Sequence, residues 1–106
     1  MDRVATFQSF IARAPRDPFP RYGLAMELRS RGQLDDAWAA FEVLLSEFPS
    51  YVPTYLMAGQ MLVTLGRTAD AARVLRDGVA QATASGDAHA RGELEAALAE
   101  LPSEVR

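Results

Sequence analysis

The sequence predicts an all-α fold of about six helices, built from a repeated pair of helices. Residues recur at an interval of 34, which pairs Gly32 with Gly66 and places Phe7, Phe41 and Leu75 in one series. Apolar residues follow helical spacing through most of the chain, and no segment shows the alternation typical of a strand. Proline and glycine separate the apolar segments at short intervals. A fixed period between about 20 and 50 residues indicates a stack of one supersecondary unit.

Each expected helix has its own start and stop signals. The helices are expected at about residues 2–14, 19–31, 34–48, 53–65, 69–83 and 88–101. Asp2 suits the N-cap of the first helix, and Pro15 and Pro49 end the first and third. Gly32 and Gly66 end the second and fourth, because glycine readily adopts the left-handed conformation common at helix C-termini. Six such elements joined by short loops predict antiparallel neighbours.

Other local signals mark the fourth and sixth helices and the packing of the first helix pair. Pro53 suits the first turn of the fourth helix. The segment Ser85-Gly86-Asp87 predicts a break followed by the N-cap of the sixth helix. Small residues at Ala25 and Ala37 predict close approach within the first helix pair, and the period repeats this feature one unit later.

Composition limits the classes of function. The chain has 106 residues, a formal net charge of −3 and 11 basic residues, all of them arginine. This balance argues against nucleic-acid binding, which rests on clustered positive charge. Cysteine is absent, which excludes disulfides and thiolate metal sites. The chain shows neither an apolar run of about 18 residues nor a secretory signal, so we expect a soluble cytoplasmic protein without a membrane partner.

The repeated residues resemble the tetratricopeptide repeat (TPR), a 34-residue helix–turn–helix unit. The first unit matches at Leu24, Ala25, Leu28, Gly32, Ala37, Phe41, Leu44 and Pro49. The second matches at Tyr55, Gly59, Leu62, Gly66, Ala71 and Leu75. It departs from the family pattern at Thr68, Gly78 and Thr83, and the missing proline at Thr83 lets the fifth helix run longer.

The resemblance implies one domain over residues 1–106, a short right-handed TPR superhelix. It is divided into an N-terminal half-repeat helix at 1–17, repeats at 18–51 and 52–85, and a C-terminal capping helix and tail at 86–106. In this family the first helices of the repeats line a concave groove that holds a peptide or helix of a partner. The positions expected to line it are Phe19, Tyr22, Met26, Arg29, Leu56, Gln60, Val63, Ala90 and Leu94. A clamp for terminal carboxylates is not expected, because the chain has neither Lys nor Asn.

Catalytic chemistry has little support in the sequence. His89 is the only histidine and is expected on the surface, and Asp35 and Asp36 suit the first turn of a helix. No nucleophile, base or cofactor motif is visible, so we expect no enzyme, no cofactor and no metal. The leading hypothesis is an adaptor that binds a segment of another protein. The alternative is a homodimer formed through exposed helix faces, with Phe7, Phe10 or Ile11 at the contact.

Overall fold

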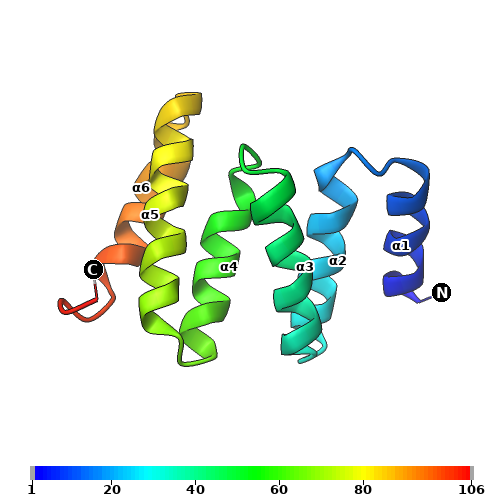
Figure 1. Cartoon of the computed structure of the whole chain (residues 1–106), viewed down its shortest axis with the longest axis horizontal. Coiled ribbons are helices and arrows are strands. Elements are labelled where there is room, and N and C mark those ends of the chain that lie inside the picture. The colour runs from blue at the N-terminus through cyan, green and yellow to red at the C-terminus, as the bar shows by residue number, and fades with distance from the viewer. Residues whose placement is uncertain (1, 106) are drawn as a thin grey trace. The chain divides into compact units, whose positions relative to one another are not determined.

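A computed structural model describes residues 2–105 and shows an all-α chain (Figure 1). The helices are α1 (Arg3–Arg13), α2 (Pro18–Ser30), α3 (Leu34–Glu47), α4 (Pro53–Thr64), α5 (Thr68–Ser85) and α6 (Ala88–Ala99). The described residues contain no strand. The predicted fold class and number of helices are therefore confirmed.

The chain divides into two compact units, Met1–Tyr51 and Val52–Arg106. The division falls at the boundary that the sequence places between the two repeats. Each unit holds three helices, and consecutive helices within a unit run antiparallel (Figure 1). The predictions of a single domain and of a right-handed superhelix both depend on how the two units are placed relative to each other, so both stay predictions.

The helices of the first unit begin and end where local chemistry dictates. The Asp2 carboxylate accepts a hydrogen bond from the Val4 amide (3.1 Å), so Asp2 caps α1 as predicted. The Asp17 carboxylate caps α2 in the same way, and α2 therefore begins at Pro18, one residue earlier than expected. Gly32 has a φ of 75°, the left-handed value predicted for the end of α2.

The core of the first unit lies between α2 and α3, where Ala25, Leu28, Ala37, Phe41 and Leu44 are buried. The small residues bring the two helices close together, and the large ones exclude water around them. Burying a side chain such as Phe41 contributes about 1.5–3 kcal/mol. The tight α2–α3 pair is thus the stable part of this unit.

The first helix is held differently, because α1 contains no buried residue. The Phe7 ring lies directly over Gly23 of α2, in the space that a Cβ at that position would need. Two ion pairs add to this contact, Asp2 with Arg31 at 2.6 Å and Arg3 with Glu27 at 3.6 Å. The α1–α2 contact thus includes a close aromatic contact at Gly23 and an ion-paired edge.

In the second unit α5 is the longest helix and runs on to Ser85, two residues beyond the expected end. It stops at Gly86, which has a φ of 73°, so the predicted break is confirmed. The Asp87 carboxylate accepts a hydrogen bond from the Ala90 amide (3.0 Å) and caps α6 as predicted. Because α6 ends at Ala99, two residues early, the buried Leu101 follows the helix instead of closing it.

Close backbone approach sets the packing of the second unit. Gly59 of α4 faces Leu75 of α5, and a Cβ at Gly59 would lie 2.6 Å from Leu75 Cδ2. Gly78 of α5 faces Tyr55 of α4 and Leu94 of α6. The helix α4 thus rests on both of the helices that follow it.

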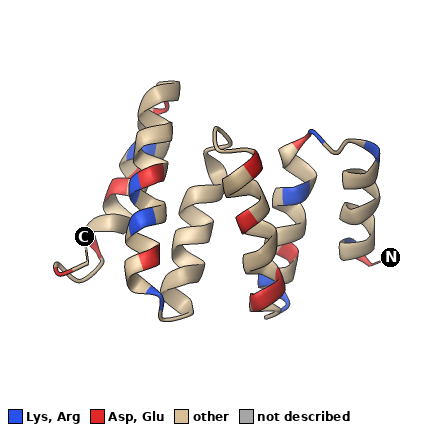
Figure 2. Cartoon of the chain, in the orientation of Figure 1, with Lys and Arg blue, Asp and Glu red and all other residues tan. Residues whose placement is uncertain are grey.

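Charge is unevenly distributed along the first unit (Figure 2). Residues 2–31 contain six arginines and three acidic residues, whereas α3 contains four acidic residues and no basic one. The helices α1 and α2 therefore carry the positive charge of this unit, and α3 carries the negative charge.

Candidate functional site

The first unit has an open hollow of about 460 Å³ between α1 and α2. Its lining consists of Arg3, Phe7, Phe19, Tyr22, Gly23, Met26, Glu27 and Ser30. Phe19, Tyr22 and Met26 are three of the residues predicted to contact a partner. The structure brings these three together.

The α2 side of the hollow follows from helical spacing. Phe19, Tyr22 and Met26 stand at i, i+3 and i+7, which places them on one face of α2. Phe19 is 64% exposed and the other two are half-buried. Phe7 of α1 closes the base of the hollow above Gly23, where only a residue without a side chain leaves room for the ring. An exposed aromatic group beside a fixed apolar base is a feature of protein-binding surfaces.

One end of the hollow is aromatic. The rings of Tyr22 and Tyr51 meet edge to face with centroids 5.8 Å apart. Burial raises the pKa of Tyr22 above its ordinary value of 10.0, the Tyr51 hydroxyl raises it further, and the positive charge of Arg29 opposes both. Arg29, also predicted to contact a partner, is half-buried on α2, and its charge acts on Tyr22. It does not line the hollow itself.

The opposite edge of the hollow is an ion-pair network. Glu27 accepts from Arg31 (3.0 Å) and lies 3.6 Å from Arg3, while Arg31 also pairs with Asp2. The hydrogen bond from Arg31 holds the pKa of the Asp2 carboxyl below its ordinary value, and the Val4 amide lowers it further. Arg3 is 79% exposed, so most of its surface remains open to a partner.

The residues predicted from α4 occupy one face of that helix. Leu56, Gln60 and Val63 stand at i, i+4 and i+7; Gln60 is exposed and Val63 is 45% exposed. Leu56 is half-buried. The expectation that this face and α2 form one concave groove depends on the placement of the two units and stays a prediction.

Leu94 was expected in the groove, and the structure shows that this expectation is wrong. Leu94 is 1% exposed and packs beside Gly78 and Tyr55 in the core of the second unit. The burial has a physical cause: α4 rests on α6 as well as on α5, so this position is covered by the chain itself. Ala90, also expected there, is half-buried.

Sequence reasoning missed the contribution of α1 to the hollow. Phe7 had been placed in the repeat series and named as a possible homodimer contact but not as part of the groove, and Arg3 and Gly23 had no assigned role. The signal that could have found them is the repeat itself, because α1 occupies the place of a second helix. In this chain a second helix is followed directly by the first helix of the next repeat, as α1 is by α2.

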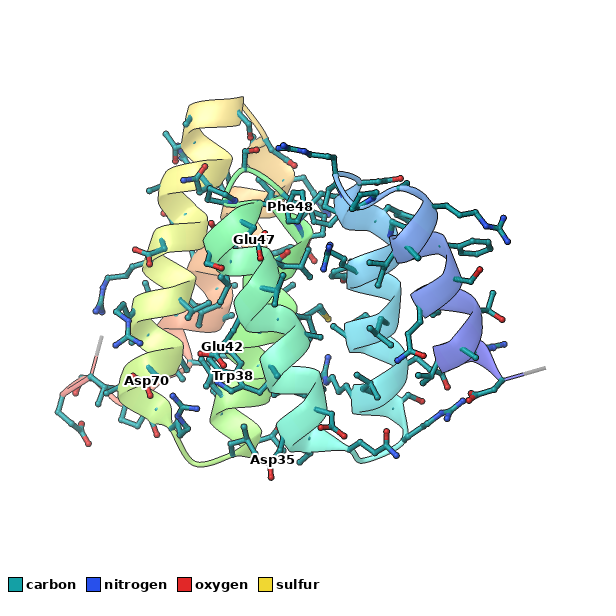
Figure 3. All side chains as sticks on the ribbon, turned by 45° about the vertical axis from the view of Figure 1, so that its right-hand side comes forward. Asp35, Trp38, Glu42, Glu47, Phe48 and Asp70 are labelled. Atoms are coloured by element: carbon teal, nitrogen blue, oxygen red, sulfur yellow. The ribbon has the colours of Figure 1, made fainter. Side chains whose placement is uncertain are left out.

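The surface of α3 has a different character. Figure 3 shows Trp38 and Glu42 leaving α3 on the same side, and Asp35 stands one turn before Trp38. Trp38 is half-buried, and the two acidic residues are exposed. At the C-terminal end of α3, the Arg21 guanidinium lies 5.8 Å from the centre of the Phe48 ring, a cation–π contact.

Residues 2–105 contain no group of three or more His, Asp or Glu side chains that could hold a metal ion. None of the helices described for these residues is long and apolar enough to cross a bilayer.

Comparison with known proteins assigns the family. No protein-family model matches the sequence, and no curated protein matches it. The crystal structure of a tetratricopeptide repeat domain protein from Salinibacter ruber is similar, with a TM-score of 0.76 and 36% identity, covering 79% of this chain and 93% of that chain. A solution NMR structure of a tetratricopeptide repeat domain protein from the same organism has a TM-score of 0.77 and 36% identity, covering 81% and 87%. Since the identity extends over most of both chains, this chain belongs to the tetratricopeptide repeat family.

Proposed function

We propose that this chain is a non-enzymatic adaptor that binds a segment of another protein through the exposed apolar faces of α2 and α4. The observation that carries the proposal is the hollow of about 460 Å³, in which Phe19, Tyr22 and Met26 gather beside Phe7. The fold is in general a helical-repeat protein-interaction fold, and the proposal is consistent with it.

The apolar side chains of the hollow would supply most of the affinity. The main driving force of such binding is the removal of apolar surface from water, which is favourable by about 25 cal/mol for each Å². The exposed ring of Phe19 can cover a partner side chain that enters the hollow, and the arginines of α1 and α2 favour a partner with negative charge. We infer an apolar, acidic segment as the ligand.

The test compares single charged substitutions in the tagged chain, purified from its native cell after brief crosslinking. Met26→Glu places a charge in the hollow, and Gln60→Arg places one on the α4 face. A protein that the wild type retains should be lost with one or both variants. Gln8→Glu is the matched control, because Gln8 is exposed on α1 outside the hollow. Equal retention by all variants, with unchanged circular dichroism, would refute the proposal.

A second candidate function is a homodimer through α1, and one observation favours it. Phe10 is 43% exposed on a helix that has no buried residue, whereas the half-buried Phe7 ring packs against Gly23 of α2. Sedimentation velocity at increasing concentration tests it. A single monomeric species at every concentration removes this candidate, and a dimer that Phe10→Glu dissociates supports it.

A further inference from the structure

The two units contain the same kinds of helix in opposite order. The period of 34 residues makes α2, α4 and α6 equivalent first helices, and it makes α1, α3 and α5 equivalent second helices. The first unit therefore reads second–first–second, and the second unit reads first–second–first. Only the second unit therefore contains a first helix together with the two helices that follow it.

The second unit shows how a first helix sits on the two helices that follow it. Gly59 of α4 lies against Leu75 of α5, and Tyr55 of α4 lies against Gly78 of α5 beside Leu94 of α6. Under this cover Leu75 and Leu94 are each 1% exposed. The α5–α6 pair is thus a seat for a helix, and α4 fills it.

The α1–α2 pair of the first unit is the equivalent seat. Two periods separate Phe7 from Leu75, Phe10 from Gly78 and Met26 from Leu94. Phe7 and Met26 are half-buried and line the open hollow, and Phe10 is 43% exposed. Positions that α4 covers in the second unit are therefore accessible in the first.

We propose that the hollow between α1 and α2 receives an amphipathic α-helix of a partner protein, seated on α1 and α2 as α4 is seated on α5 and α6. This inference rests on the proposed function and specifies the form of its ligand. The bound helix runs antiparallel to α1, because α4 runs antiparallel to α5 (Figure 1).

The side chains of the seat define the chemistry of the partner. Gly59 leaves room for Leu75 in the second unit, so the partner carries a small residue opposite Phe7. At the next contact the sizes are reversed: Gly78 accommodates Tyr55, whereas the equivalent position on α1 is Phe10, whose larger side chain requires a small residue opposite. Tyr55 and Gly59 are four residues apart, so the partner has two small residues at i and i+4.

Charge adds a third requirement. Arg3 stands where Ala71 stands in the second unit, about one helical turn beyond the contact of Phe7. It is 79% exposed, and its pairing with Glu27 at 3.6 Å is long. The other cation at this edge, Arg31, is held by Asp2 and Glu27. An acidic residue one turn after the second small residue therefore complements Arg3.

A synthetic peptide of about 16 residues tests this, since a helix of that length becomes stable once its apolar face is buried. The peptide carries Ala at i and i+4, Leu at the positions that follow each Ala, and Glu at i+7. Binding is followed by the ¹³C-methyl signals of methionine, because Met26 lines the hollow and Met57 and Met61 belong to α4. We expect a saturable shift of Met26 below about 1 mM peptide, with Met57 and Met61 unchanged.

Two matched changes test the helical form and the charge. A peptide with proline at its centre cannot form the helix and should bind at least about tenfold more weakly. Arg3→Glu should weaken peptide binding about threefold. A peptide with Arg in place of Glu should restore the lost affinity for the Arg3→Glu variant, and for that variant only. Phe10→Glu should remove binding; Phe10 is already exposed, so the fold should be retained.

The outcomes separate this inference from the proposed function. If Met26 does not shift, if the proline peptide binds equally well, or if Phe10→Glu has no effect, the helical seat is refuted. If the peptide tests fail in one of these ways but a native partner is still lost with Met26→Glu, the proposed function stands and its ligand is an extended segment. If Met26→Glu and Gln60→Arg both still retain that partner, while the peptide shifts the Met26 signal of the wild type, the adaptor function is refuted and the helical seat stands.

Discussion

Gly78 and Tyr55 bring α5 and α4 together through direct contact of backbone and side chain. A Cβ at Gly78 would lie 2.5 Å from the Cβ of Tyr55 and 3.0 Å from Cδ2 of Leu94. Glycine within a helix costs about 1 kcal/mol relative to alanine, yet here it makes room for an aromatic side chain. The departure from the family pattern at this position thus has a structural cause.

Gly78→Ala should destabilise the protein despite the better helix propensity of alanine. Overpacking against the Tyr55 Cβ costs up to about 3 kcal/mol and the propensity gain offsets about 1, so we expect a net loss of up to about 2 kcal/mol. Urea unfolding measures it. The matched control is Gly92→Ala on α6, where a Cβ meets open space, and this variant should gain up to about 1 kcal/mol. Equal effects of the two substitutions would contradict the packing.

Phe41→Ala should cost about 3–5 kcal/mol, because it removes a fully buried ring from the centre of α3. Thermal unfolding by circular dichroism measures the loss. Glu42→Ala changes the next, exposed residue and should leave the stability within about 0.5 kcal/mol. A midpoint for Phe41→Ala close to that of the wild type would show that α2 and α3 do not pack around this ring.

Gly66→Ala should destabilise the α4–α5 turn, because Gly66 has a φ of 76° and an L-residue pays about 1–2 kcal/mol there. Space does not limit the substitution, since a Cβ would meet nothing within 4 Å. Gly66→Asn should therefore lose less, as asparagine tolerates this conformation better. Identical losses in urea unfolding would assign the cost to something other than the backbone angle.

Stability should fall in acid partly through Asp70. The hydrogen bond from Arg67 holds the pKa of the Asp70 carboxyl below its ordinary value of 3.8, and Arg73 lowers it further. A group with a depressed pKa in the folded state stabilises the fold above its unfolded pKa, and this contribution is lost as pH falls through the folded value. Asp70→Asn should therefore show a flatter decline than the wild type below about pH 4. Parallel pH profiles would rule out this linkage.

Most of the fold could be predicted because its signals are local. Asp2, Asp87, Gly32 and Gly66 act within a few residues of their own positions, and the structure gives each the predicted role. The end of α5 was placed less accurately. With no proline after Thr83, only the left-handed Gly86 stops the helix.

The candidate site was harder to predict because its exposure depends on what covers each helix. Met26 and Leu94 occupy the same position in two repeats, and the period alone assigns them the same role. The structure separates them, because α4 rests on α6 within the second unit and buries Leu94, while Met26 lines an open hollow. Periodicity identifies equivalent positions; solvent access follows only from the tertiary contacts.

The weak attachment of α1 has a consequence for the time-averaged state of the molecule. A helix without a buried side chain opens at a smaller free-energy cost than the core it flanks, so its amides exchange with solvent through local rather than global unfolding. Phe7 and Arg3 leave the hollow whenever α1 detaches. We therefore expect one wall of the hollow to exchange between docked and undocked forms, and we expect a ligand that contacts it to hold α1 in place and slow that exchange.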